Sequence, residues 1–347
     1  MAHKPLIYWV SMPTEVEYDM DILSKLSKKM TLRVCTVGTP AVSHPYGIDI
    51  SFKPYYICDG DGANQQDLFS RIVADKPDLV IKKGGWAASQ SGQLGLFPSI
   101  MRASNIRHCL WTSEQGPCRD WQMDVARFYE YIVVNNTPDY HLYQRTFAGA
   151  IHKIGYMPFG CIPEYHKPIP MSKASLMCSY TNPQWGVPEK AASFMRIVGA
   201  LIEEYTPKEL ALYGKDKWYM GPFEDWHRGE FPYTDFVKAN NSVDILLGVT
   251  ANAIHGGYGC KLAKMLACGK MVLWDYTKDM EFDFKNKYHL VWTKSADETK
   301  KLVKYYLNHT KERNAIARNG RKFACEHLSW EKNILGLLEW IKAYDRT

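Results

Sequence analysis

Residues 255–275 read HGGYGCKLAKMLACGKMVLWD, and this stretch indicates the fold more directly than any other. Gly256, Gly257 and Gly259 come directly before a segment whose apolar residues recur with the period of a helix. Gly269 follows at the position where a glycine commonly ends a helix, and an apolar run then predicts a strand. A glycine-rich turn before a helix can bind a phosphate through its backbone N–H groups, although many such turns are only structural. The stretch therefore predicts part of an α/β fold with a candidate anion site.

Short apolar runs alternate with helix-periodic segments along the whole chain. This alternation predicts mostly parallel sheets with helices on both faces, and continuous apolar strands fit burial on both sides. Strands are expected at residues 6–11, 31–38, 78–82, 107–112 and 131–134, then at 174–180, 209–214, 244–249, 271–275 and 289–293. Helices are expected at residues 20–29, 65–74, 188–204, 259–268, 296–309, 311–327 and 330–344, with an irregular loop at 216–232.

A proline-rich stretch near the middle divides the chain. Pro158, Pro163, Pro168 and Pro170 fall within residues 153–171, so this stretch can be neither a helix nor a central strand. At roughly 150 residues per domain, the 347 residues correspond to about two domains. We expect an N-terminal domain at 1–155, a linker at 156–172, a C-terminal domain at 173–328, and a final helix at 329–347 that packs back toward the N-terminal domain.

The composition excludes several classes of protein. The net charge of +6 is too small to establish a nucleic-acid partner, and no run approaches the ~18 uncharged apolar residues of a membrane-spanning helix. The nine scattered cysteines form no C-x-x-C pair, so they indicate buried thiols of a cytoplasmic protein (the host cytoplasm if the protein is viral) and no dedicated metal site. G-x-G-x-x-G and G-K-[ST] motifs are absent, which argues against a dinucleotide fingerprint or a P-loop.

Residues 258–341 resemble the C-terminal half of GT-B glycosyltransferases, in particular the group-1-like and CgeB-like branch. The resemblance lies in LAKMLACGKMVLWD, in the following Glu281 and Phe282, and in NHTKERNAIARNGRKFACEHLSWEKNILGLLEWI. KIGYMPFGCIPEYHKP is similar to the linker of that family. The resemblance implies two Rossmann-like domains facing a central cleft, with C-terminal helices. It also implies transfer of a sugar from a nucleotide-diphosphate donor, expected to be a UDP-sugar, without a prosthetic group or a required metal.

One position departs from the family pattern. Members usually carry a glutamate in the F-E-A-L-A-C-G helix that binds the ribose hydroxyls of the donor, whereas this chain has Lys264 there. An ammonium group cannot accept those hydrogen bonds. Lys264 could instead bind a donor phosphate or an acidic acceptor, or it could be a solvated helix position. The donor is then bound in an unusual way, or the chain is a catalytically weakened relative.

The resemblance also implies a set of donor-binding residues. Ser179 and Tyr180 follow the first strand of the C-terminal domain, where GT-B donors meet backbone and hydroxyl groups. Lys190, and less so Arg196, could reach a diphosphate from the next helix, although each could be an ordinary solvated cation. The full expected set is Ser179, Tyr180, Lys190, Gly256, Gly257, Tyr258, Lys261 and Lys264.

The acceptor side is expected at the end of the strand 107–112. In inverting GT-B enzymes a carboxylate after such a strand deprotonates the acceptor hydroxyl, and Glu114 falls one position later than the family pattern would place it. Asp120 is a weaker competitor. Trp86 and Trp111 could offer stacking surfaces to a sugar or base, although aromatic residues also build cores.

Three functions remain open from the sequence. The first is a glycosyltransferase acting on a hydroxyl of a surface glycan, a lipid-linked glycan or a protein. The second is a viral DNA glycosyltransferase acting on 5-hydroxymethylated pyrimidines, an architecture that phage enzymes share. The third is a degenerate GT-B module that binds a partner without chemistry, for which the missing ribose glutamate is the best evidence.

Overall fold

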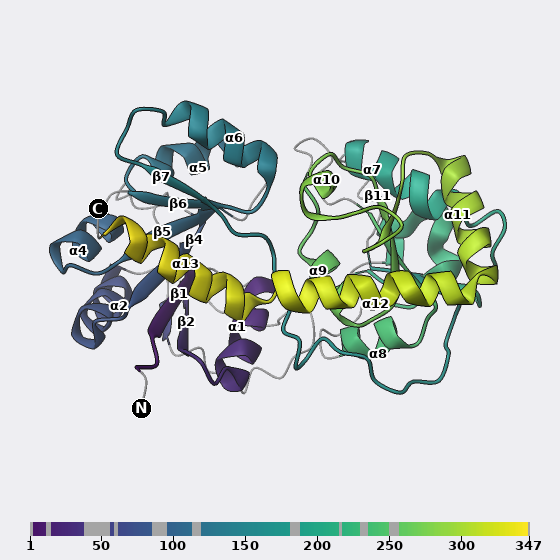
Figure 1. Ribbon diagram of the computed structural model, residues 1–347, viewed down its shortest axis with the longest axis horizontal. Coiled ribbons are helices and arrows are strands. Elements are labelled where there is room, and N and C mark those ends of the chain that lie inside the picture. Colours follow the sequence, from purple (N-terminus) through teal and green to yellow (C-terminus); the bar gives the residue numbers. More distant parts are fainter. Residues whose placement is uncertain are drawn as a thin grey trace. The chain divides into compact units, whose positions relative to one another are not determined.

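The computed structural model describes residues 3–11, 15–37, 56–58, 62–84, 96–112, 119–180, 188–214, 217–229, 235–249 and 257–345 (Figure 1). They divide into two compact units. The N-terminal unit comprises the described residues up to Pro158 together with those from Trp330 onward, and the C-terminal unit comprises Phe159–Ser329. Each unit holds one sheet, and every strand pair in both sheets is parallel, so the prediction of an α/β fold with parallel sheets is confirmed.

The N-terminal unit is built on seven strands in the order β3-β2-β1-β4-β5-β6-β7. The inner strands are apolar and buried along most of their length, because helices flank the sheet (Figure 1). The strands are β1 Leu6–Ser11, β2 Thr31–Val37, β3 Tyr56–Cys58, β4 Leu79–Lys83, β5 His108–Thr112, β6 Tyr131–Val134 and β7 Lys153–Tyr156. The helices are α1 Glu15–Leu26, α2 Gly62–Asp75, α4 Leu96–Ala103, α5 Arg119–Ala126, α6 Thr137–Thr146 and α13 Trp330–Tyr344.

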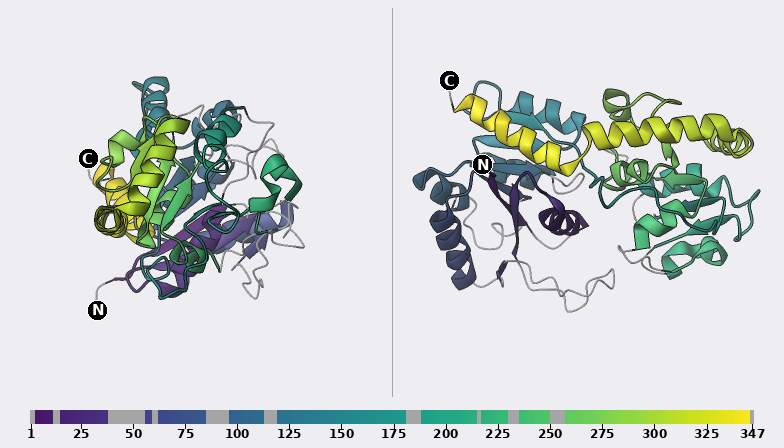
Figure 2. Two further views of the ribbon diagram at one scale, coloured as in Figure 1. Left: turned by 90° about the vertical axis from the view of Figure 1, so that its right-hand side faces the viewer. Right: turned by 60° about the horizontal axis from the view of Figure 1, so that its bottom comes forward.

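The C-terminal unit is built on five strands in the order β12-β11-β10-β8-β9, again flanked by helices (Figure 2). The strands are β8 Met177–Ser179, β9 Leu210–Leu212, β10 Ile245–Gly248, β11 Met271–Asp275 and β12 Val291–Thr293. The helices are α7 Pro188–Phe194, α8 Phe236–Asn241, α9 Lys261–Ala267, α10 Met280–Asp283, α11 Ala296–Asn308 and α12 Thr310–His327.

Two local predictions differ from the structure, and the edge strands β3 and β7 were not predicted. β7 lies at the start of the proline-rich stretch and ends before Pro158, and as an edge strand it agrees with the exclusion of a central strand there. The helix expected at 188–204 is α-helical only to Phe194 and continues as the π-helical turn Met195–Gly199. The loop expected at 216–232 contains two short 3₁₀ segments within Lys217–Trp226, which are separated by a kink at Gly221.

Gly269 ends α9 as predicted. Its φ of +75° lies in the left-handed region that glycine adopts without strain, and it follows the C-cap residue Cys268. α9 itself begins at Lys261 and has seven residues, so it is shorter than the sequence pattern predicts.

Three tryptophans fix α13 to the core of the N-terminal unit. Trp9 of β1, Trp111 of β5 and Trp330 of α13 are completely buried, and their ring centroids lie 5.2–5.9 Å apart. The Trp330 indole N–H donates to the Asp19 carboxylate at 3.2 Å. The chain therefore returns to its N-terminal unit by burying a large aromatic side chain. Within the described part of the chain, no helix combines the length and the apolar character needed to cross a membrane.

Candidate donor site

The strand order locates a crevice in the C-terminal unit. β8 pairs with β9 on one side and with β10 on the other, so the direction in which the chain builds the sheet reverses between β8 and β10. Ligands of open α/β sheets bind at such a switch point, beyond the carboxyl ends of the strands. Ser179 ends β8, and the segment that follows β10 leads to Gly257 and α9. The described ends of these two connections, Ser179–Tyr180 and Gly257–Lys261, therefore mark the candidate site.

Ser179 places a hydroxyl group at the end of β8. Its side chain is completely buried, and its Oγ has no hydrogen-bond partner among the described residues. An unpaired buried hydroxyl is costly, so such a group indicates a position where a ligand or water completes the hydrogen bonding.

Tyr180 contributes its backbone rather than its phenol. Its ring stacks on Tyr213 with centroids 5.5 Å apart and also packs against Phe236. Burial raises the pKa of Tyr180 well above its ordinary value, so the phenol stays neutral. The Tyr180 carbonyl oxygen accepts a hydrogen bond of 3.1 Å from the Lys261 ammonium group. This bond connects the end of β8 to the first residue of α9.

Lys190 and Lys261 lie near each other at the carboxyl end of β8. Lys190 of α7 is only 9% exposed, and no ion pair or hydrogen bond of its side chain is found among the described residues. Burial, and then the positive charge of Lys261, lower the pKa of Lys190 to about 8. A bound anion would stabilise both ammonium groups, so the pair favours a ligand with two negative charges or a diphosphate.

Gly257 and Tyr258 form the entry to α9. Gly257 is buried, and the Tyr258 phenol donates to the Asp283 carboxylate at 2.6 Å while its ring packs edge-on against Phe284. Tyr258 is 2% exposed, so its side chain anchors the turn, and the expected donor binding by this turn stays a prediction. Gly256 lies outside the described residues.

Lys264 is an interior residue. Its side chain is 1% exposed, so the alternative of a solvated helix position is wrong. It lies near His166, which is completely buried, and the Lys264 charge adds to burial in holding the pKa of His166 well below its ordinary value. The His166 Nδ1 accepts a hydrogen bond from the Ile162 N–H at 3.0 Å. Lys264 of α9 is thus buried near a histidine of the proline-rich stretch.

Asp275 is a buried charged residue near the candidate site that the sequence did not predict. It ends β11, is 2% exposed, and accepts hydrogen bonds of 3.0 and 2.6 Å from the Arg196 guanidinium. These bonds raise the pKa of Arg196, which stays charged. Its charge is compensated by the Asp275 carboxylate, so Arg196 is already paired and is a poor candidate for binding a diphosphate. A lone aspartate directly after an apolar strand was the available signal in the sequence.

Of the residues expected at the acceptor side, the structure describes the side chain of Trp111 alone. Trp111 is completely buried in the tryptophan cluster, and its indole N–H donates to the Met157 carbonyl at 3.2 Å. It offers no surface to a ligand, so the expectation of a stacking role is wrong. Glu114 and Trp86 lie outside the described residues, as does the side chain of Asp120. No group of three or more His, Cys, Asp or Glu side chains that could hold a metal ion is found in the described ranges.

Comparisons with known proteins agree with this architecture. Residues 195–339 match a family model described as glycosyl transferase-like. HepE of Anabaena, solved with UDP and glucose, superposes with a TM-score of 0.69 at 12% identity over 98% of this chain and 100% of HepE. A glycosyltransferase from Rickettsia africae gives 0.66 at 10% identity, covering 98% of both chains. Sucrose-phosphate synthase from Thermosynechococcus elongatus gives 0.62 at 10% identity, covering 99% of this chain and 100% of the synthase. A search of curated protein sequences finds no significant match.

The chain therefore has the GT-B fold of glycosyltransferases. Its C-terminal part is glycosyl transferase-like in sequence, as the motifs around α9 and α12 predicted. The comparisons give no support to a DNA-modifying enzyme or to a non-catalytic module over a glycosyltransferase.

Proposed function

We propose that the protein transfers a glycosyl group, a hexose or a pentose, from a UDP-sugar to an acceptor hydroxyl. The observation that carries the proposal is the pair of Lys190 and Lys261 beside the unpaired Ser179 hydroxyl, at the switch point of the C-terminal sheet. HepE, which has the same fold, was solved with UDP-glucose as well as with UDP. A UDP-sugar supplies the diphosphate that a pair of ammonium groups would bind.

The lysine pair has a definite task in this reaction. When the bond between the sugar and the β-phosphate breaks, negative charge develops on the departing diphosphate. Lys190 and Lys261 would stabilise that charge from fixed positions, which is the largest contribution that many active sites make. Ser179 would donate its hydroxyl hydrogen to a phosphate oxygen, and the backbone at Gly256 and Gly257 would lie close to the diphosphate. If these groups supply the stabilisation, adding EDTA should leave the transfer rate unchanged.

Acceptor activation is proposed for Glu114. If the reaction inverts the anomeric carbon, Glu114 would take the proton of the attacking hydroxyl, with Asp120 as the second candidate. If the reaction retains the configuration, Glu114 would orient the acceptor. The proposed acceptors are a surface glycan, a lipid-linked glycan or a protein. Glu114→Gln keeps the shape of the side chain and removes the base, so kcat should fall by about 10²–10⁴-fold with unchanged UDP affinity in the inverting case.

Calorimetry with UDP tests the donor site. Lys190→Met removes the buried charge and keeps the length of the side chain, so it should weaken UDP binding at least tenfold. Lys238→Met is the matched control, because Lys238 is exposed on α8 and pairs with Asp235. Equal UDP affinity of the wild type and Lys190→Met would refute this donor site.

A further inference from the structure

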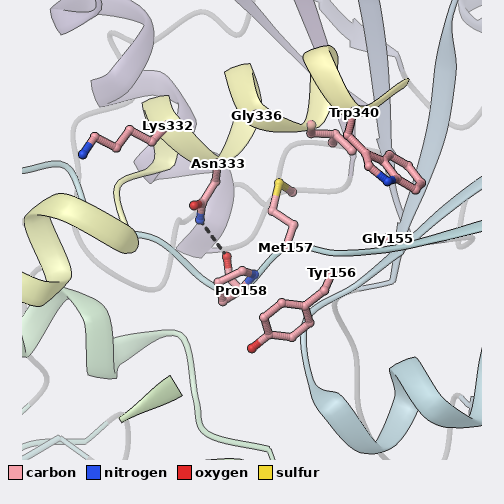
Figure 3. A pocket seen from close by; sticks show the side chains of 9 residues that line it. Gly155, Tyr156, Met157, Pro158, Lys332, Asn333, Gly336 and Trp340 are labelled. Atoms are coloured by element: carbon pink, nitrogen blue, oxygen red, sulfur yellow. Dashed lines mark hydrogen bonds between the residues drawn. The ribbon is translucent and has the colours of Figure 1, made fainter. Parts of the chain in front are cut away.

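A second candidate binding site lies in the N-terminal unit, between the edge strand β7 and the helix α13. It is a cavity of about 290 Å³, at the lower end of the size range of small-molecule sites. Its lining combines an aromatic wall, two glycines and an amide (Figure 3). No residue of the proposed donor site contributes to it.

Trp340 forms a fixed wall of this cavity. Its ring lies so close to Gly155 that a Cβ there would come within 3.1 Å of the indole. Tyr131 and Tyr344 pack edge-on against the same indole, with centroids 5.8 and 5.3 Å away. The indole is therefore held on several sides before any ligand arrives, which lowers the entropy lost on binding.

Gly336 keeps the space beside Trp340 open. It lies one turn before Trp340 in the middle of α13, where glycine is less favourable than alanine. A Cβ at Gly336 would meet no atom within 4 Å, so packing within the described structure does not require a glycine. The consequence of the glycine is an unfilled volume next to the aromatic wall.

Asn333, which also belongs to α13, brings hydrogen-bonding capacity to the lining of the cavity. One of its N–H groups donates to the Pro158 carbonyl at 3.0 Å, which fixes the amide as Figure 3 shows. The carbonyl oxygen and the second N–H of the amide then have a defined direction. A wall with one aromatic face and one oriented amide suits a ligand that is apolar on one side and hydroxylated at its edge.

We infer that this cavity binds a single pyranose ring of the acceptor glycan. The C–H face of a sugar ring would pack on the Trp340 indole, and its hydroxyl groups would exchange hydrogen bonds with Asn333. An acyl chain would match the indole but would bury the amide without partners, which is unfavourable. Only the identification of the sugar as part of the acceptor rests on the proposed function.

Fluorine NMR of protein labelled with 5-fluorotryptophan tests this site without a donor. Trp340→Phe identifies the Trp340 signal, because that signal is missing from the spectrum of the variant. The probes are glucose, galactose, N-acetylglucosamine and maltotriose at millimolar concentration, with n-octyl phosphate as the apolar comparison. At least one sugar should shift the Trp340 signal in a saturable way.

Gly336→Leu fills the open volume and should weaken that sugar at least tenfold. Glu339→Leu is the matched control, since it adds the same side chain to α13 outside the lining and should bind the sugar like the wild type. The inference is overturned if no sugar shifts the Trp340 signal, if only n-octyl phosphate does, or if Gly336→Leu binds the sugar unchanged. If a sugar shifts the Trp340 signal but the protein does not bind UDP, the sugar site in the N-terminal unit is supported and only the proposed function is refuted.

Discussion

Lys190 lies close enough to Lys261 that the charge of Lys261 adds to burial in lowering the pKa of Lys190 to about 8. Two like charges therefore lie near each other at the carboxyl end of β8, where Lys261 donates to the Tyr180 carbonyl oxygen and the Ser179 hydroxyl has no partner among the described residues. Such an arrangement is unfavourable in the empty protein and becomes favourable when an anion binds. The proximity of these two lysines therefore lowers the stability of the protein without a ligand and favours anion binding at the proposed donor site.

The affinity for UDP should depend on pH because of Lys190. Its ammonium group is charged below about pH 8 and neutral above it, so UDP affinity should fall as the pH rises through this value. The Lys190→Met variant lacks the titrating group and should show a flat profile over the same range. Calorimetric titrations from about pH 7 to about pH 9.5 measure both profiles. Parallel profiles in the two proteins would show that Lys190 does not contact the ligand.

The same pKa shift predicts how the empty protein responds to pH. The folded pKa of Lys190 is depressed, so between about pH 8 and pH 10.5 the unfolded chain binds a proton that the folded chain does not. The contribution of Lys190 to the unfolding free energy should therefore rise across this window and be most unfavourable below about pH 8. Comparing urea denaturation of the wild type and Lys190→Met isolates this contribution. A wild type that loses stability relative to the variant as the pH rises would contradict the sign.

Lys190→Met should also separate stability from binding. Removing a buried charge without a carboxylate partner should leave the unfolding free energy unchanged or raise it by up to ~2 kcal/mol at neutral pH. UDP affinity should fall at least tenfold in the same protein. A variant that is strongly destabilised would indicate that Lys190 serves the fold, and denaturation curves decide between the two.

Two helical glycines should respond to alanine in opposite directions. Gly336→Ala should raise the unfolding free energy by about 1 kcal/mol, because the added methyl meets open space in α13 and glycine is a poor helix former. Gly320→Ala should lower it by about 1–3 kcal/mol, because its Cβ would lie 2.2 Å from the His289 carbonyl oxygen. Thermal or urea denaturation measures both. Equal changes in the two variants would show that the packing described around α12 and α13 is incorrect.

The tryptophan cluster should carry much of the stability of the N-terminal unit. Trp330→Ala removes a completely buried indole and leaves a cavity beside Trp9 and Trp111, so it should cost about 3–5 kcal/mol. Tyr344→Ala, on the same helix but 40% exposed, should cost less than about 1.5 kcal/mol. Urea denaturation followed by circular dichroism gives both values. Similar costs would mean that α13 is not anchored by Trp330.

The sequence predicted every strand that the structure describes except β3 and β7, which form the two edges of the N-terminal sheet. β1, β4, β5 and β6 are buried nearly throughout, which produces the continuous apolar runs on which the prediction rested. β7 begins with a lysine and contains Gly155, and an edge strand next to a proline has no such pattern. Its existence depends on pairing with β6, a contact that local sequence does not encode.

The site shows the same limit. The resemblance indicated Lys190 and Lys261 separately, but their proximity follows from the adjacency of β8 and β10 in the sheet. Lys264 is buried near His166, and Trp111 packs against Trp330, so each contact joins residues that are far apart along the chain. The periodicity of helices and strands predicts which residues face a core. It does not predict which residues from separate segments contact one another in that core.

A crystal structure of the protein soaked with UDP would test the central claim most directly. We expect the diphosphate at the switch point of the C-terminal sheet, with phosphate oxygens within about 3.2 Å of the Lys190 and Lys261 ammonium groups and of the Ser179 hydroxyl. UDP bound with its diphosphate away from both lysines would contradict it.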